Sequence, residues 1–240
     1  MSDSARFRLL GSRRAGGAEV RATGPQTRRQ LLGRTARVLG GLAVAKHLSG
    51  CLEEGPVALV YLRDRTISAG EGRADFDQEF ARQVLDGGCL EGGWIAFVDL
   101  SSQPRFIEGG PARNGKAVRR AYAKLLASSG PTHEGTDTCR GLALAEEWLA
   151  RPEFRQARRI VLGWTDLIAD AASRSDGSKQ VFRDPLEFPW QKLQPEVQIW
   201  GVPIAQARAV RTAWNLRVLR TYLPGDRFDA KLLGLTPRSL

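Results

Sequence analysis

Hydroxyl and carboxylate side chains stand at three places in this sequence where a predicted strand ends or a predicted helix begins. Asp64, Thr66 and Ser68 follow one apolar run, Thr136 lies at a predicted helix start, and Asp166 follows another apolar run. All five side chains present oxygen, which suits a hard cation such as Mg²⁺ or Mn²⁺. Because only two of the five are charged, a cation held by them keeps unneutralised positive charge and can bind a carboxylate from another molecule.

The elements that would position these groups alternate along the chain from residue 56 onward. Apolar runs predict strands at 57–62, 94–100, 159–164 and 197–202, with a short antiparallel edge strand at 105–107, and helical spacing predicts helices at 75–86, 114–126, 136–149 and 204–223. Residues 167–196 are mostly polar and predict a long loop. The alternation is typical of the α/β class, here a Rossmann-like three-layer domain with a mostly parallel central sheet and helices on both faces.

The predicted sheet explains how groups that are distant in sequence can meet. In an open parallel sheet, the carboxyl ends of the strands and the amino ends of the helices lie along one edge, where ligands bind. Asp64 and Asp166 are 102 positions apart, but each follows a predicted strand, and Thr136 precedes a predicted helix. The sequence therefore predicts that the five oxygen-bearing side chains converge at this edge and hold a metal ion.

These residues resemble a known site, the metal-ion-dependent adhesion site of von Willebrand factor A (vWA) domains. Its three parts are D-x-S-x-S, then a Thr, then an Asp, and they are similar to Asp64-x-Thr66-x-Ser68, to Gly135-Thr136-Asp137 and to Trp164-Thr165-Asp166, in that order, within residues 56–224. The resemblance implies that Thr66 and Ser68 bind Mg²⁺ directly, that Thr136 binds it directly or through water, and that the two aspartates act mainly through bound water. It also implies a non-catalytic module that binds a protein partner through an acidic side chain.

Three departures from the family pattern bear on the metal and leave the fold prediction intact. Thr66 replaces the first Ser, which keeps the hydroxyl but stiffens the loop, and Leu167 stands where the family usually has Gly. Residues 167–196 also lack a clear helix–strand repeat. A vWA-like scaffold whose metal site has decayed therefore remains an alternative.

A second motif keeps an enzyme alternative open. Residues 110–116 fit the G-x-x-x-x-G-K core of a phosphate-binding loop, which would make the chain a nucleotide- or phosphate-binding enzyme. However, Ala117 occupies the position of the metal-binding hydroxyl, and the loop follows a later strand than the motif requires. A turn with a helix cap at Asn114 is the favoured interpretation. A phosphatase with an aspartate nucleophile at Asp64 would need a second Asp in place of Thr66.

The charge and composition exclude several other classes of function. The net charge is +10, but residues 1–50 contain 10 Lys and Arg against 2 Asp and Glu, whereas residues 51–240 contain 26 against 24. Nucleic-acid binders usually carry their basic excess on the folded domain, so the sequence predicts no nucleic-acid partner. No apolar run reaches the ~18–20 residues of a membrane span. His47 and His133, with three cysteines that lack C-x-x-C spacing, predict neither a structural zinc site nor a His-dependent triad.

The first fifty residues resemble an export signal. Thr27-Arg28-Arg29-Gln30-Leu31-Leu32-Gly33, an apolar stretch at 38–45 and Leu48-Ser49-Gly50-Cys51 are similar to a twin-arginine signal that ends in a lipoprotein box. The resemblance implies lipidation of Cys51 and a bacterial envelope protein that faces the periplasm, with the membrane contacted only through the lipid. Basic residues within the apolar stretch leave a basic amphipathic helix of a cytoplasmic protein as the alternative.

The remaining expectations concern domain limits and side chains outside the site. We expect a leader at 1–50, the vWA-like domain at 51–224 and a tail at 225–240. Cys89 and Cys139 would be the thiols left after removal of the leader, and the sequence leaves their redox state open. The pairs Glu146-Glu147 and Arg158-Arg159 are predicted to face solvent. Five tryptophans are predicted to be core residues: Trp94, Trp148, Trp164, Trp200 and Trp214.

Overall fold

The sheet that organises the domain has six strands, five of them parallel. The computed structural model describes residues 55–66, 68–70, 72–90, 92–128, 135–168, 171–173, 179–190 and 192–235. The strands are β1 (Val57–Asp64), β2 (Trp94–Leu100), β3 (Arg105–Pro111), β4 (Arg158–Trp164), β7 (Glu196–Trp200) and β8 (Leu219–Thr221). They lie in the order β3-β2-β1-β4-β7-β8, and β3 alone runs antiparallel to its neighbour.

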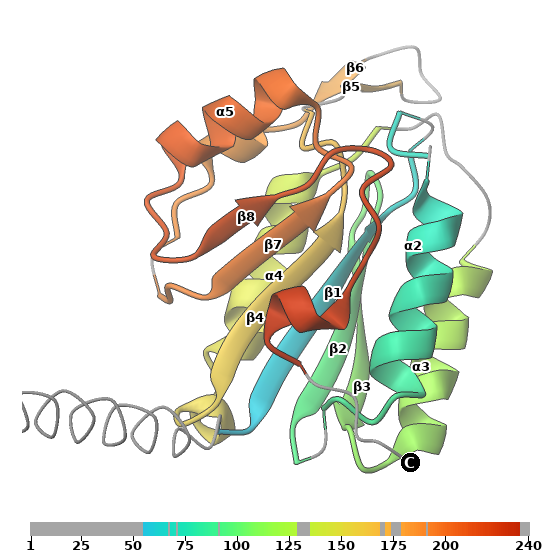
Figure 1. Cartoon of the computed structure of the whole chain (residues 1–240). Coiled ribbons are helices and arrows are strands. Elements are labelled where there is room, and N and C mark those ends of the chain that lie inside the picture. Colours follow the sequence, from blue (N-terminus) through green and yellow to red (C-terminus); the bar gives the residue numbers. More distant parts are fainter. Residues whose placement is uncertain are drawn as a thin grey trace, which may run out of the picture. The chain divides into compact units, whose positions relative to one another are not determined.

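Helices cover both faces of this sheet (Figure 1). They are α2 (Arg73–Phe80), which continues as a π-helical turn at Ala81–Leu85, α3 (Gly115–Ala127), α4 (Thr138–Leu149) and α5 (Ile204–Ala213). Side chains of α2 and α3 form one core with the sheet, and side chains of α4 and α5 form the other. The predicted class is confirmed: a Rossmann-like three-layer α/β domain with a mostly parallel sheet.

The central strand β1 is buried on both faces, which explains its unbroken apolar run. Leu59 and Tyr61 belong to the core under α2 and α3, whereas Val60 and Leu62 belong to the core under α4 and α5. Side chains alternate between the faces of a strand, so a strand covered on both sides needs apolar residues at every position. The parallel pairing of β1 with β2 and β4 then brings Asp64 to the carboxyl edge of the sheet.

Close packing positions α4 on the sheet. A Cβ atom added at Gly141 would lie 2.1 Å from Cδ2 of Leu100, so the absence of a side chain allows the helix to approach β2. The helix begins after Asp137, whose carboxylate accepts a hydrogen bond from the backbone N–H of Arg140 at 3.0 Å. Thr136, the residue before this cap, is thereby held at the carboxyl edge of the sheet.

The structure differs from the sequence prediction in the C-terminal third. The helix expected at 204–223 ends at Ala213, because Trp214 turns into the core and donates from Nε1 to the carbonyl of Pro185 at 3.0 Å. Residues 219–221 then form the edge strand β8 beside β7. Within the loop expected at 167–196 lie a small antiparallel pair, β5 (Ala171–Ser173) and β6 (Lys179–Val181), and a 3-10 turn at Pro185–Glu187.

The chain remains part of the domain beyond residue 224. Phe228, Ala230, Leu233 and Leu235 are buried in the core beneath α2, and a 3-10 turn, η4, spans Ala230–Leu233. The ring of Phe228 packs against those of Phe76, Phe80 and Trp200. The residues expected to be a tail therefore complete one of the two cores.

Three of the four charged side chains expected to face solvent make specific contacts, among them Arg159, whose Nε donates to the carbonyl of Phe154 at 3.1 Å. Glu146 is buried, and its Oε1 accepts hydrogen bonds from the backbone N–H groups of Lys192 at 2.8 Å and Leu193 at 3.2 Å. Arg158 forms a two-pronged ion pair with Glu196 at 2.6 and 2.7 Å, joining β4 to β7. Glu147 is exposed as expected, and Arg159 is partly buried. Of the five tryptophans expected in the core, four are buried and Trp94 is partly buried.

Several expectations fall on residues outside the described ranges. The predicted export segment, Cys51, His47 and His133 lie there. Within the described ranges, no helix is both long enough and apolar enough to cross a membrane. Cys89 and Cys139 are free thiols.

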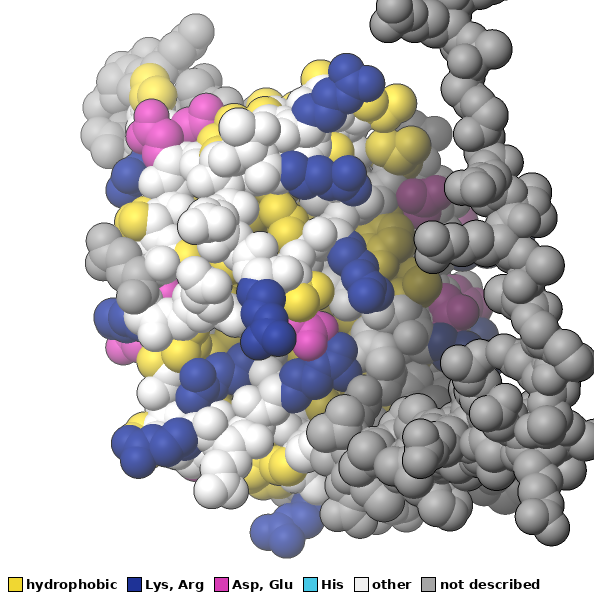
Figure 2. Space-filling view, turned by 60° about the vertical axis from the view of Figure 1, so that its left-hand side comes forward, with side chains coloured by type: hydrophobic (Ala, Val, Ile, Leu, Met, Phe, Trp, Pro, Cys, Tyr) yellow, Lys and Arg dark blue, Asp and Glu magenta, His cyan; other side chains and the backbone are white. Residues whose placement is uncertain are grey.

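Basic side chains predominate on the face of the domain that carries α5 and β8. Figure 2 shows lysine and arginine side chains spread over this face, with few acidic ones between them. Residues 204–235, which include α5 and β8, contain six basic and two acidic residues. The near-balance of charge over residues 51–240 therefore conceals a local excess.

Candidate metal-ion site

The five residues predicted to form a metal site lie together at the carboxyl edge of the sheet. Asp64 ends β1, Thr66 and Ser68 lie in the loop that follows, Thr136 precedes α4, and Asp166 lies two residues after the end of β4. Since β1 and β4 are parallel neighbours, their carboxyl ends emerge side by side. The convergence expected from the order of the elements is therefore present.

Hydrogen bonds link four of these five residues around Asp64. Its Oδ1 accepts from Oγ1 of Thr66 at 2.8 Å and from Oγ1 of Thr136 at 3.0 Å. The backbone N–H of Thr66 donates to the same oxygen at 2.9 Å. The Oγ of Ser68 donates to Oγ1 of Thr66 at 3.3 Å. Thr66, Thr136 and Ser68 therefore present their hydroxyl oxygens around one carboxylate.

The direction of these bonds matters for metal binding. A hydroxyl has one proton and two lone pairs, so a threonine that donates to Asp64 keeps lone pairs free to bind a cation. Thr136 is in this state, and Thr66, which also accepts from Ser68, keeps one lone pair. The carboxylate thus orients the two hydroxyls as electron-pair donors without itself having to touch the ion.

Thr165 is a member of the cluster that the sequence reasoning did not select. Its Oγ1 donates to Oδ2 of Asp64 at 2.8 Å and accepts from the backbone N–H of Leu167 at 3.1 Å. The residue is fully buried. Its place between Trp164 and Asp166 in the motif was the available signal, since it brings a hydroxyl to the same edge.

The carboxylate of Asp166 is buried and only partly hydrogen-bonded. The side chain is only 3% exposed, and Oδ1 accepts from the backbone N–H of Ile168 at 3.0 Å. Among the residues that the structure describes, Oδ2 of Asp166 has no hydrogen-bond partner. A buried carboxylate oxygen without a partner is costly, and a cation or ordered water would satisfy it. The residues present therefore fit a bound metal ion.

The electrostatics of the site favour a positive charge. The pKa of the Asp64 carboxyl is raised above its usual value, mainly because the group is buried. Hydrogen bonds from Thr66 and Thr165 lower this pKa, and the charge of Asp166 raises it. Two buried carboxylates close to one another repel, so a cation between them would stabilise both ionised forms. The described residues contain no group of three or more His, Cys, Asp or Glu able to hold a metal, and a metal here would depend on hydroxyls.

The loop between β1 and α2 is held from behind by two side chains. Nη1 of Arg73 donates to the carbonyl of Asp64 at 2.6 Å and to that of Thr66 at 3.4 Å. The indole Nε1 of Trp164 donates to the carbonyl of Ala69 at 2.5 Å. These bonds fix the backbone that carries Thr66 and Ser68, so the hydroxyls are positioned before any ligand arrives.

Leu167 adopts the backbone conformation that usually requires glycine. Its φ is +55°, the left-handed region that side chains with a Cβ rarely occupy. The side chain is fully buried, and the carbonyl accepts from Nε2 of Gln206 at 2.5 Å. Leu167, which replaces the glycine of the vWA pattern, therefore forms the same kind of turn. The packing of its buried side chain offsets the strain of the left-handed backbone.

The phosphate-loop motif lies elsewhere. Because β3 is antiparallel, Pro111 pairs with Trp94 at the start of β2, so residues 110–116 lie at the opposite edge of the sheet. Oδ1 of Asn114 accepts from the backbone N–H of Ala117 at 3.3 Å and caps α3. The favoured interpretation of this segment, a turn with a helix cap at Asn114, is confirmed.

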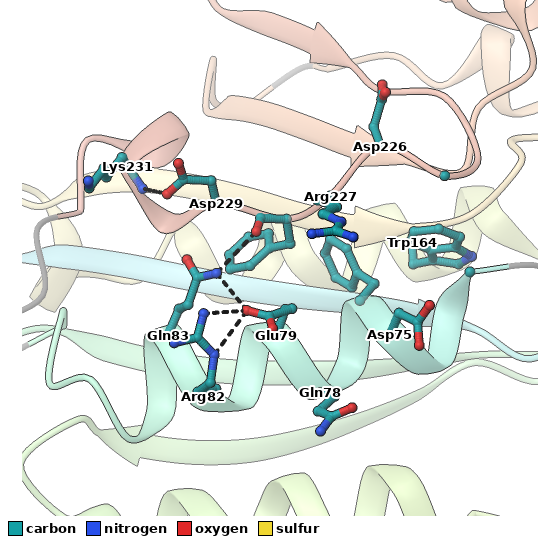
Figure 3. A pocket seen from close by; sticks show the side chains of 14 residues that line it. Asp75, Gln78, Glu79, Arg82, Gln83, Trp164, Asp226, Arg227, Asp229 and Lys231 are labelled. Carbon is teal, nitrogen blue, oxygen red and sulfur yellow. Dashed lines mark hydrogen bonds and ion pairs between the residues drawn. The ribbon is translucent and has the colours of Figure 1, made fainter.

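A cavity of about 950 Å³ lies between α2 and the segment at 225–231, and none of the five predicted residues lines it. Figure 3 shows its walls: Glu79 of α2, with Arg82 and Gln83 of the π-helical turn, lies on one side, and Asp229 and Lys231 lie on the other. Gln83 ties the two walls together by donating to the carbonyl of Phe228 at 3.1 Å. The mixed charges of the walls indicate no single class of ligand.

Solved structures of other proteins are similar to this chain in fold. No family model and no curated protein matches the sequence. The PilB minor pilin from Streptococcus sanguinis, solved as a point mutant, has a TM-score of 0.52 at 10% identity, covering 72% of this chain and 58% of the pilin. The SpRpn10 VWA domain has a TM-score of 0.48 at 11% identity, covering 76% and 96% of the two chains. The conserved hypothetical protein BatB from Bacteroides thetaiotaomicron has a TM-score of 0.45 at 9% identity, covering 74% and 94%.

At these identities the likenesses concern the fold alone. The pilin shares the α/β architecture, and this chain spans little more than half of it, 58%. The strand order β3-β2-β1-β4-β7-β8 and the likeness to the pilin agree on the fold class.

Proposed function

We propose that this chain is a non-catalytic protein-interaction module that binds an acidic side chain of a partner through a Mg²⁺ ion at the carboxyl edge of its sheet. The observation that carries the proposal is the single cluster formed by Asp64, Thr66, Ser68 and Thr136, with the buried, partner-free oxygen of Asp166 beside it. Mn²⁺ has the same preference for oxygen and is the expected substitute.

Each residue has a definite part in this proposal. Thr66, Ser68 and Thr136 would hold the ion through neutral hydroxyl oxygens, and Asp64 orients the two threonine hydroxyls by accepting their hydrogen bonds. Asp166 would supply its free Oδ2, directly or through water. When bound, the ion supplies a positively charged position that a carboxylate from outside can complete. Arg73 and Trp164 keep the loop in place.

A binding role is favoured over catalysis by the composition of the cluster. The described part of the site has two carboxylates and four hydroxyls, and the hydroxyls of Thr66, Thr136 and Thr165 all donate to Asp64. A solved vWA domain and a minor pilin among the similar structures are in keeping with a role in assembly. We also propose export through the N-terminal signal, with lipidation at Cys51 and a periplasm-facing location.

The test is calorimetric titration of Mg²⁺ and Mn²⁺ into the full chain and into two double variants. Asp64→Ala/Asp166→Ala removes the site carboxylates. Asp75→Ala/Glu153→Ala removes the same charge from exposed positions away from the cluster. Saturable binding is expected in the wild type and in the second variant, and its loss is expected in the first. Ligand at about 100 times its Kd stabilises a fold by about 2.7 kcal/mol, so melting should shift upward by roughly 5–10 °C.

The outcomes separate the proposal from its alternatives. Equal binding by all three proteins would show that the metal lies elsewhere. No binding by a folded wild type would sink the metal mechanism and favour the decayed scaffold. If ATP binding is detected and is abolished by Lys116→Ala, the phosphate-loop enzyme replaces the interaction module; we expect neither effect.

A further inference from the structure

Six basic side chains surround the free edge of the sheet at β8, and we propose that they form a second binding surface, for an acidic polypeptide segment of a partner protein. We call this set the β8 rim: Arg208, Arg211, Arg217, Arg220, Arg227 and Lys231. They belong to α5, the loop after it, β8 and the segment that leads into and through η4. The inference goes beyond the metal-dependent function and uses none of its residues.

The fold brings these residues to one edge from both faces of the sheet. Nη2 of Arg211 on α5 donates to Oγ1 of Thr221 in β8 at 3.4 Å. Nη1 of Arg220 in β8 donates to the carbonyl of Leu232 in η4 at 2.7 Å. Because α5 belongs to one core and the segment at 228–235 to the other, these bonds show that the rim wraps around the edge.

Most of the charge of the rim is not neutralised by ion pairs within the domain, although Arg227 lies within electrostatic reach of Glu79 of α2. Across the described part of the chain, none of the six side chains forms an ion pair, whereas arginines elsewhere do, as in Arg151–Glu108 at 2.9 Å. The two acidic residues of the region cap turns: Asp226 accepts from the N–H of Leu223 at 2.7 Å and Asp229 from that of Lys231 at 2.9 Å. All six rim residues are exposed, so the surface attracts anions (Figure 2).

The kinds of side chain on the rim favour a protein partner. Five of the six are arginines, whose planar guanidinium groups bind carboxylates in two-pronged pairs. Within the described residues, the exposed large apolar side chains are all aliphatic, Ile204, Leu223 and Leu232 among them near the rim. Single-stranded nucleic acids stack on exposed aromatic rings, and membrane surfaces favour aromatic residues at the interface. Both partners lack their usual contacts here.

The strand edge itself favours an extended segment. Among the strands that the structure describes, β8 pairs with β7 on one side and with none on the other. An unpaired edge can form backbone hydrogen bonds with an added strand. The positive charge of the rim would repel the same edge of a second copy of this chain and attract a segment that carries carboxylates. The charge therefore favours an acidic strand as the one added to β8.

The chain provides a matched control for general electrostatic attraction. Lys116, Arg120 and Lys124 lie along one exposed side of α3, and the bonds found among the described residues include none from their charged groups. Arg208, Arg217 and Arg227 of the rim are in the same condition. Charge reversal of either set of three changes the net charge equally and removes no hydrogen bond or ion pair found among the described residues. Arg227→Glu also brings a second carboxylate near Glu79, so the Gln substitution at this position is measured beside it.

The experiment measures anisotropy of a labelled peptide of about twelve residues that alternates Glu with Thr, since alternation places the carboxylates on one side of an extended chain. The full-length chain is used, in excess EDTA, at about 50 mM salt, where exposed charges are weakly screened. We expect Arg208→Glu/Arg217→Glu/Arg227→Glu to weaken binding about tenfold or more, and Lys116→Glu/Arg120→Glu/Lys124→Glu to weaken it less than about threefold. A peptide with Gln in place of Glu should not bind.

Contrary results would be equally clear. Similar losses in both variants would reduce the effect to general attraction by a basic chain, and unchanged binding in the rim variant would overturn the proposal. Tighter rim-dependent binding of phosphatidylglycerol vesicles or of an oligonucleotide would replace the partner class. If the reversed variant fails to fold, the Gln substitutions at the same three positions take its place. Because EDTA is present, these results do not depend on the metal site.

Discussion

Gly141→Ala tests whether α4 is placed by its close contact with β2. The added Cβ would lie 2.1 Å from Cδ2 of Leu100, against about 3.5–4.0 Å for an ordinary carbon contact, so one side must move by roughly 1.5 Å. Leu100 is fully buried, which leaves its side chain little room to turn away. Overpacking of this kind costs about 1–3 kcal/mol, while Ala in place of Gly in a helix returns up to about 1 kcal/mol.

The expected net effect is a loss of about 1–2 kcal/mol in the free energy of unfolding, measured by urea titration with tryptophan fluorescence and an unchanged m-value. Gly115→Ala is the matched control, because a Cβ there meets nothing within 4 Å and the residue starts α3. That variant should be neutral or more stable by up to about 1 kcal/mol. Melting temperatures should differ between the two by a few degrees, at about 2–4 °C per kcal/mol for a domain of this size.

A second substitution makes the reasoning refutable in detail. In a Leu100→Ala background the clash is absent, so Gly141→Ala should lose its cost and become neutral or stabilising. If Gly141→Ala is as stable as Gly115→Ala in the wild-type background, the contact does not constrain the helix. If its cost persists without the Leu100 side chain, the cause lies elsewhere.

The remaining predictions concern the site and its surroundings. Asp64→Asn removes a buried charge whose ionisation burial disfavours, so the metal-free protein should melt at the same or a higher temperature, while the upward shift with Mg²⁺ disappears. Leu167→Gly relieves a left-handed strain of about 1 kcal/mol but deletes a fully buried side chain, so a urea titration should show a net loss of about 1–3 kcal/mol; a gain would mean that the strain dominates. Burial raises the pKa of Cys139 to about 11, so the reactive thiolate is the minor form up to about pH 10. The alkylation rate of Cys139, followed by peptide mass spectrometry, should therefore rise about tenfold per pH unit between about pH 8 and 10. A plateau of this rate near pH 8 would contradict the prediction.

The sequence predicted the elements correctly where burial and the spacing of apolar residues indicate the same structure. The run from Val57 to Leu62 indicated a strand covered on both faces, and the predicted helix starts at 114 and 136 lie within two residues of the observed ones, Gly115 and Thr138. Those two facts place Asp64 and Thr136 at one edge of a parallel sheet. The five predicted site residues could therefore be identified from element order and side-chain chemistry.

The parts that could not be predicted depend on tertiary contacts. Ile204 to Leu223 has helical spacing throughout, and only the core contact of Trp214 with Pro185 shows why the helix stops and β8 begins. Glu146 looks like any surface glutamate until the loop at 192–193 supplies two N–H groups. Thr165 joins the site by reaching Asp64 across neighbouring strands, a contact that local patterns do not encode.

The pairing of β1 also determines when the domain can complete itself during synthesis. Ala58 pairs with Trp94, and Val57 pairs with Arg158, 101 positions later. Strand β1, the first of the described strands to be synthesised, therefore keeps one row of backbone groups unpaired until β4 has emerged, and folding limited by such distant contacts is slow. Asp64 meets Asp166 only at that stage. The complete set of site residues is thus assembled late in folding. Metal binding by a nascent chain would therefore indicate that β4 has paired with β1.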